Sequence, residues 1–257
     1  MSVYNNAPHL PAAIESILAQ SFADFEFLIV DDGSTDGSGA IIDGFAARDP
    51  RIRVIRQQNR GLVFSLNRLI GEAQALLIAR MDGDDIALPD RFARQLAFLH
   101  AHPDHGVLGT EADQMDETGQ TWRGDTPLPH DHDGIAAMLE HRSPLYHSSV
   151  MMRRDLVRDA GGYRPAYAHC EDYDLWLRLS ARTRIANLPE PLMRYRHSPG
   201  QVTTRHALAL SIGGAVARLA HAERQAGRPD PTHGLDHLPP VEALDALFGR
   251  PGVADRV

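Results

Sequence analysis

Apolar residues along the first hundred positions alternate between helical spacing and short continuous runs. Leu10, Ile14 and Ile17 recur at helical spacing, and the apolar run at 25–30 that follows is typical of a strand buried on both faces. The same alternation predicts helices around 41–45, 62–73 and 92–99, and strands at 51–56, 75–79 and 107–108. Strands that alternate with helices are typical of βαβ units, so this half is predicted to be α/β with a mostly parallel sheet.

The remainder of the chain has a different organisation. A polar segment at 119–133 predicts an exposed connection into a second, mixed half. In that half we expect strands at 147–152, 185–188 and 192–195, and helices at 172–180 and from about Thr204 to Gln225. The Pro- and Gly-spaced tail after Arg228 is predicted to be the least structured segment. The expected division is a main domain over 1–203, with halves at about 1–118 and 134–203, and a C-terminal helix and tail over 204–257.

Composition excludes several function classes. The 257 residues carry 34 acidic and 26 basic side chains, a formal charge of −8, which argues against a nucleic-acid partner. All basic residues are arginine, so a pyridoxal-phosphate Schiff base or a P-loop phosphate site is excluded, and the single Cys170 excludes internal disulfides. We find neither a secretory signal pattern nor an apolar run of about 18 residues, so the predicted location is the cytoplasm.

Acidic residues follow two of the predicted strands, which matters because ligands of open α/β sheets bind beyond the carboxyl ends of the strands. In the segment 82–85, Asp82 and Asp84 flank a glycine that allows both carboxylates to converge on one ion. Hard divalent cations such as Mg²⁺ prefer oxygen ligands of this kind. The alternative is a solvated acidic turn, because Asp and Gly are also ordinary turn residues.

The earlier acidic segment, 31–37, permits other interpretations. From Asp32 onward it matches the spacing of a calcium-binding loop, but a strand precedes it rather than a helix. An aspartyl-nucleophile phosphatase requires Asp-x-Asp and a lysine, whereas Asp31 and Asp32 are adjacent and lysine is absent. A calcium-binding structural module remains as a third, less favoured hypothesis.

A further acidic pair, Glu171 and Asp172, opens a predicted helix. Asp172 shares a helical face with Leu175 and Trp176, so its carboxylate is expected to be partly desolvated, with a pKa raised toward that of a general base. Alternatively, the pair only complements the helix dipole. Most of the 14 histidines lie in polar connections; His197, just after a strand, is a weak candidate for a metal ligand.

Taken in order, these segments resemble the inverting family 2 glycosyltransferases, which have the GT-A fold. The resemblance runs from Val3 to about Thr203, and its elements are Val3-Tyr-Asn5, the helix ending at 16–21, Phe27 to Asp36, Asn59 to Leu62, Met81 to Asp85, His147 to Arg154, Gly161 to Tyr163 and Glu171 to Arg178. It implies a Rossmann-like sheet flanked by helices, with a mixed acceptor-side half.

The resemblance also implies roles for individual residues. Asp172 would be the catalytic base that deprotonates the acceptor hydroxyl. Asp82 and Asp84 would form the Asp-x-Asp motif that holds Mn²⁺ or Mg²⁺ against the donor diphosphate. The implied nucleotide-binding residues are Tyr4, Asn5, Asp31, Asp32, Asn59, Arg60 and Asp82. Glu171 and Trp176 would lie on the acceptor side.

These roles predict a metal-dependent transfer of a sugar from a nucleotide-linked donor, most often UDP-linked in this family, to a glycan or lipid-linked acceptor of cell-surface polysaccharide synthesis. Peripheral association with the inner face of the membrane is a further expectation. One departure stands out: the family's first strand, an apolar run ahead of Val3, is missing, because the chain begins at Met1-Ser2. We therefore expect a marginally folded chain, and the alternative function is a nucleotide-binding protein of this type with impaired catalysis.

Overall fold

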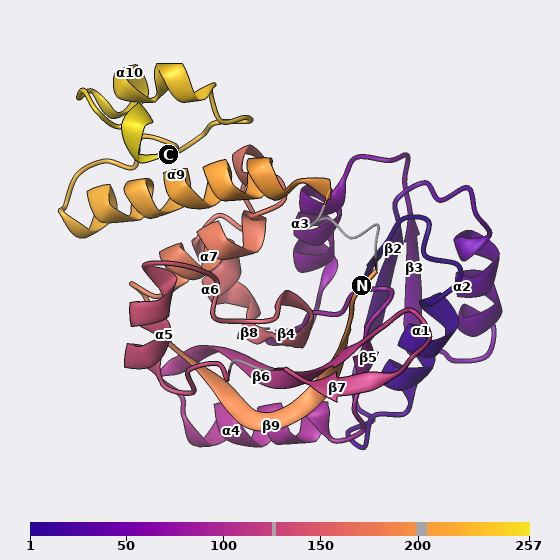
Figure 1. The fold of residues 1–257 in the computed structure, drawn as a ribbon. Coiled ribbons are helices and arrows are strands. Elements are labelled where there is room, and N and C mark those ends of the chain that lie inside the picture. Colours follow the sequence, from indigo (N-terminus) through magenta and orange to yellow (C-terminus); the bar gives the residue numbers. More distant parts are fainter. Residues whose placement is uncertain (125–126, 199–204) are drawn as a thin grey trace.

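In the computed structural model, which describes residues 1–124, 127–198 and 205–257, the chain begins with a small parallel sheet (Figure 1). Its strands are β1 (Ser2–Val3), β2 (Phe27–Asp31) and β3 (Ile52–Arg56), in the order β1-β2-β3. The connecting helices are α1 (Leu10–Leu18), α2 (Ser38–Ala46) and α3 (Leu62–Glu72). Every residue of β2 is buried, as its continuous apolar run predicts.

A second, mixed sheet lies beside the first. Its strands are β4 (Leu77–Ala79), β5 (Ile86–Ala87), β6 (His105–Met115), β7 (Thr121–Arg123), β8 (Met151–Arg153) and β9 (Arg184–Arg196). The order is β4-β8-β6-β9-β5, with β7 paired to β6. Of these pairs, β6 and β9 run parallel and the others antiparallel. Parallel pairing, predicted for the first half, is thus confirmed for β1–β3, while β4, β5 and β6 join the mixed sheet.

Helices cover both sheets (Figure 1). The remaining α-helices are α4 (Arg91–Ala101), α5 (His132–Leu139), α6 (Arg154–Asp159), α7 (Glu171–Leu179), α9 (Ala207–Gln225) and α10 (Leu244–Phe248). Single 3₁₀ turns are at His147–Ser149, Pro165–Tyr167, Val241–Ala243 and Ala254–Arg256. None of the helices in the described ranges combines the length and apolarity that crossing a bilayer requires.

The described part of the polar segment 119–133 has no buried residue, as predicted, but it contains β7, which forms a hairpin with β6. Two local predictions were wrong. The two strands expected at 185–188 and 192–195 form one strand, β9, because shifts in its register with β6 let it bend without ending. The tail after Arg228 packs into the core of the second half, where Leu244 and Val253 are buried. The predicted boundary at Thr203 and helix start at Thr204 lie outside the described residues.

Candidate active site

Three carboxylates gather in the loop between β4 and β5. One oxygen each from Asp82, Asp84 and Asp85 lies within 4.8 Å of the others. Burial, followed by repulsion from Asp82, raises the pKa of Asp84 to about 6 and that of Asp85 to about 8. The Oδ2 atom of Asp85 is buried and has no hydrogen-bond partner among the described residues. Clustered oxygen ligands whose charges repel one another are suited to binding a hard divalent cation, so this donor set fits Mn²⁺ or Mg²⁺.

Arg196, at the end of β9, fixes the backbone of this loop. Its backbone N–H donates to Asp85 Oδ1 over 2.8 Å, and its guanidinium Nε donates to the Asp84 carbonyl oxygen over 2.8 Å. Nη1 of the same guanidinium donates to the Asp116 carbonyl oxygen over 2.8 Å, just beyond the end of β6. The backbone and the side chain of Arg196 therefore both help to hold the acidic loop against the mixed sheet.

Arg80, the last residue before Met81 and the acidic loop, is a buried cation in this site. Its guanidinium pairs with the carboxylate of Asp82, and within the part of the chain that the structure describes its Nε has no hydrogen-bond partner. The charge of Arg80 opposes the rise in the pKa values of Asp84, Glu171 and Asp172. The charge of Arg80 therefore acts on carboxylates of both the acidic loop and the start of α7.

Glu171 and Asp172 form the first turn of α7. Glu171 is buried, whereas Asp172 keeps a solvent-exposed edge. Burial and the neighbouring Asp172 raise the pKa of Glu171 to about 7, and burial also raises the pKa of Asp172. A partly desolvated carboxylate at the mouth of a site can accept a proton from a hydroxyl group.

Asp32, at the end of β2, organises a neighbouring loop through its two carboxylate oxygens. Oδ1 accepts from the backbone N–H of Arg60 over 2.9 Å and from Gln57 Nε2 over 2.7 Å, and Oδ2 accepts from the N–H of Gly61 over 2.9 Å. Gly33 permits this close approach, because a Cβ there would lie 2.9 Å from the backbone nitrogen of Asn59. The exposed side chains of Asn59 and Arg60 are thereby held beside the end of β2.

Asp31 has a structural role as well. Its carboxylate pairs with Arg56 of β3 over 2.6 Å and accepts from the backbone N–H of Ser34 over 3.0 Å. These contacts fix the turn that follows β2.

The loop after β1 is clamped to this turn. Asn5 adopts a left-handed conformation with φ of +53°; its N–H donates to Ser34 Oγ, and its Oδ1 accepts from Thr35 N–H over 2.8 Å. This leaves the side chain of Tyr4, which is 50% exposed, on the surface beside the ends of β1 and β2. The site thus has a polar rim from β1–β3 and an acidic floor from the second sheet.

Comparison with known proteins agrees with this geometry. The family model described as "Glycosyl transferase family 2" matches residues 1–161 of the chain. The chain belongs to this family. EpsE of Bacillus subtilis (strain 168), which is named as a glycosyltransferase, is 37% identical over 84% of this chain and 78% of its own. The amylovoran biosynthesis glycosyltransferase AmsE of Erwinia amylovora is 32% identical over 80% of this chain and 77% of its own.

Solved structures share the fold. TarS 1–349 of S. aureus in complex with UDP-GlcNAc has a TM-score of 0.65 at 15% identity, over 96% of this chain and 77% of that one. The mannosyltransferase PcManGT of Pyrobaculum calidifontis, in complex with GDP-Man and Mn²⁺, has a TM-score of 0.60 at 17% identity. The match covers 96% of this chain and 66% of that one. The GT-A fold expected from the sequence is confirmed.

Two other candidate residues have contacts of their own: Trp176, proposed from the glycosyltransferase resemblance, and His197, proposed as a weak metal ligand from its position after a strand. Trp176 is fully buried in the core, which leaves it no surface for an acceptor. His197 Nε2 pairs with Gln114 Oε1 over 2.6 Å, and its ring stacks with Trp122. Among the described residues, the third carboxylate in the group that could hold a metal ion comes from Asp85.

Sequence reasoning also missed Arg80 and Arg196 in this glycosyltransferase site. The only available signal for Arg80 was its position two residues before Asp82. Arg196 carried none, since it is 112 residues from Asp84 in sequence.

Proposed function

We propose that this chain is an inverting, metal-dependent glycosyltransferase that moves a sugar from a nucleotide-diphosphate donor, UDP-linked, to a hydroxyl group of a glycan or lipid-linked acceptor in polysaccharide synthesis. The observation that carries the proposal is the group formed by Asp82, Asp84 and Asp85 together with Asp172, whose pKa responds to the charges of both Arg80 and Asp82. The presence of both the Asp82–Asp84–Asp85 group and Asp172 favours an enzyme over a nucleotide-binding protein with impaired catalysis. The relatives named for polysaccharide synthesis and the UDP-GlcNAc complex of TarS support the class of donor and product.

In the proposed mechanism Asp82, Asp84 and Asp85 would hold Mn²⁺ or Mg²⁺, which would supply positive charge for the diphosphate of the donor. Asp172 accepts the proton of the acceptor hydroxyl while the oxygen of that hydroxyl forms a bond to the anomeric carbon of the donor sugar, and the bond between that carbon and the nucleoside diphosphate breaks. Arg80 favours the ionised forms of Asp84, Glu171 and Asp172, because its positive charge offsets part of the effect of their burial on the pKa. Asp32 and Asn5 hold the 57–61 and 33–36 segments, which form the nucleotide side of the site.

A screen of nucleotide sugars with Mn²⁺, scored by release of nucleoside diphosphate, tests the proposal. We expect release from at least one UDP-sugar, lost in Asp172→Asn and retained in Asp133→Asn, which removes an exposed carboxylate on α5. UDP binding with Mn²⁺ but no turnover of any donor, with or without mixed glycan acceptors, would favour the nucleotide-binding alternative. Tight Ca²⁺ binding without nucleotide would favour the calcium-binding module.

A further inference from the structure

Trp122 is one of two tryptophans in the chain, and the two differ in exposure. Trp176 is fully buried, whereas Trp122 is 45% exposed and lies at the centre of β7, the pink arrow in Figure 1. A single exposed apolar side chain is ordinary on a protein surface. The indole of Trp122, however, is held in place by a series of side-chain contacts.

His197 supports the indole of Trp122 from one side. The two rings are stacked, with their centroids 5.6 Å apart. His197 Nε2 pairs with Gln114 Oε1 over 2.6 Å, and Gln114 Nε2 donates to the hydroxyl oxygen of Tyr146 over 2.9 Å. Gln114 is itself buried. These contacts orient the indole before any ligand is bound, which lowers the entropic cost of binding to it.

Trp122 and His197 together form an aromatic platform on the side of the mixed sheet that faces the acidic loop. Gln114 of β6 is the register partner of Trp122 on β7 and of Tyr195 on β9, so these side chains project from the same face of the sheet. Burial, and then the negative charges of the three acidic-loop carboxylates, raise the pKa of Tyr195. The effect of these carboxylates on Tyr195 indicates that this face points toward the proposed metal-binding group.

Arg196 fixes the distance between the aromatic platform and the acidic loop. Its guanidinium donates to the carbonyl oxygens of Asp84 and Asp116, each over 2.8 Å, so it joins the acidic loop to the turn between β6 and β7. His197 follows Arg196 directly in the chain. A sugar ring stacked on Trp122 would therefore lie at a defined position beside the place where the donor diphosphate is proposed to bind.

We propose that the aromatic platform is an acceptor subsite, in which one pyranose ring of a glycan stacks on the exposed face of Trp122. A pyranose presents a face of C–H groups that packs against an aromatic ring, and tryptophan supplies a large, rigid and amphipathic contact area for it. The platform lies on the mixed sheet, whereas the proposed nucleotide side is formed by β1–β3, so we assign the ring to the acceptor. That assignment rests on the proposed glycosyl transfer; the binding of a saccharide does not.

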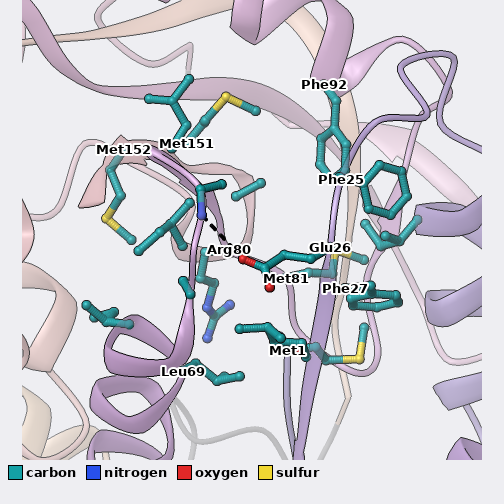
Figure 2. Close-up of a pocket in the computed structure, with 18 of the residues that line it drawn as sticks. Met1, Phe25, Glu26, Phe27, Leu69, Arg80, Met81, Phe92, Met151 and Met152 are labelled. Carbon is teal, nitrogen blue, oxygen red and sulfur yellow. Dashed lines mark hydrogen bonds between the residues drawn. The ribbon is translucent and has the colours of Figure 1, made fainter. Parts of the chain in front are cut away.

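The aromatic platform suits a glycan better than the apolar cavity shown in Figure 2. This cavity of about 370 Å³ lies beside Arg80 and Met1, and most of its lining is apolar, including Phe27, Phe92 and Met151. Burial of sugar hydroxyl groups there would cost free energy, because apolar side chains cannot replace their hydrogen bonds to water. On the exposed platform, the hydroxyl groups at the edge of the ring keep those hydrogen bonds.

The test measures saccharide binding through the intrinsic fluorescence of Trp122, without a donor, so that no turnover is involved. The probes are cellohexaose, chitohexaose, maltohexaose and mannohexaose, which share the C–H faces of pyranoses and need not be the natural acceptor. Trp122→Phe leaves Trp176 as the only tryptophan, so it reports any emission change that does not come from position 122. Calorimetric titration gives the dissociation constants for Trp122→Ala and for the control Leu76→Ala, which removes another exposed apolar side chain.

We expect at least one probe to shift the emission of the unaltered chain and no probe to shift that of Trp122→Phe. The dissociation constant should rise about 10-fold or more in Trp122→Ala and stay within about two-fold in Leu76→Ala. UDP with Mg²⁺ should not compete with the probe. The proposal is overturned by the absence of an emission change with all four probes, by equally tight binding to Trp122→Ala, or by displacement of the probe by UDP, which would assign Trp122 to the nucleotide side.

Sugar transfer gives a second readout once the donor screen has identified a pair of substrates. Trp122→Ala should then raise the KM for the acceptor by about 10-fold and leave hydrolysis of the donor within a few-fold of that of the unaltered chain. Saccharide binding at Trp122 without transfer of any sugar would support the subsite and contradict the proposed glycosyl transfer. Transfer with an unchanged acceptor KM in Trp122→Ala would retain the proposed function and overturn the subsite.

Discussion

The guanidinium of Arg80 is paired with the carboxylate of Asp82, one of the three acidic residues proposed to hold the metal ion. Arg80 is 6% exposed, so this charge acts in a low-dielectric environment where its effect on neighbouring carboxylates is strong. It opposes the rise in the pKa of Asp172 as well as that of Asp84. One cation therefore influences both the proposed metal ligands and the proposed base.

Replacement of Arg80 by glutamine should shift the pH dependence of turnover. Without the guanidinium, the pKa of Asp172 rises further, so a higher pH is needed to ionise the proposed base. We expect the acidic limb of the kcat/KM profile to move to higher pH. The exposed Arg53→Gln, which breaks a surface ion pair with Glu72, should leave the profile unchanged. A uniform loss of rate at every pH would show that Arg80 is only structural.

Replacement of Asp84 by alanine should abolish the contribution of Mn²⁺ to UDP binding. The variant lacks one of three clustered carboxylates, and the diphosphate then loses the ion that offsets its charge. Calorimetric titration with UDP, with and without Mn²⁺, measures the effect. Asp133→Ala, on the exposed face of α5, is the control. Mn²⁺-dependent UDP affinity equal to that of the unaltered chain would contradict the assignment.

Asp172→Asn preserves the shape of the side chain but removes its ability to accept a proton. Turnover should fall by about 10²-fold or more, while the affinity for UDP with Mn²⁺ stays within a few-fold. Single-turnover rates and nucleotide titration separate the two effects. Turnover within a few-fold of the unaltered chain would leave Asp172 as a charge at the start of a helix.

The periodic elements of the first half could be predicted because each is dictated by its local apolar pattern. The helix at Leu10–Leu18 and the strand at Phe27–Asp31 follow directly from the spacing of their own residues. β9 could not be predicted in the same way, since its continuity across Pro189 and Pro191 depends on the bulged pairing with β6. The burial of Leu244 likewise depends on a distant partner, the core beneath α7.

In the candidate site, too, residues with a local sequence context could be predicted, whereas contacts with distant partners could not. Asp82, Asp84 and Asp172 were identified because acidic residues at strand and helix ends have a recognisable sequence context. The partners of Asp32 were not predicted, because two of them are backbone N–H groups that carry no side-chain signature. The effect of Arg80 on the pKa of Asp172 acts between residues far apart in the sequence, which no local pattern encodes.

The amino group of Met1 gives a prediction that concerns stability alone. Burial, and then the positive charge of Arg80, lower its pKa from 8.0 to about 5. Between these values the unfolded chain binds a proton that the folded chain does not, so this group makes stability rise with pH from about 5 to 8. A shift of three pKa units corresponds to up to about 4 kcal/mol.

Buried carboxylates with raised pKa values, such as Asp85, make stability fall over part of the same range, so the effect of Met1 must be isolated by comparison. An N-terminally acetylated chain lacks the titrating amine and otherwise shares every group. We expect the free energy of unfolding of the free-amine chain to fall progressively below that of the acetylated chain as pH decreases from 8 to 5, in urea titrations with a metal chelator present. A difference that stays constant over this range would mean that the ammonium of Met1 is solvated in the folded protein, and that the cavity beside it is open to water.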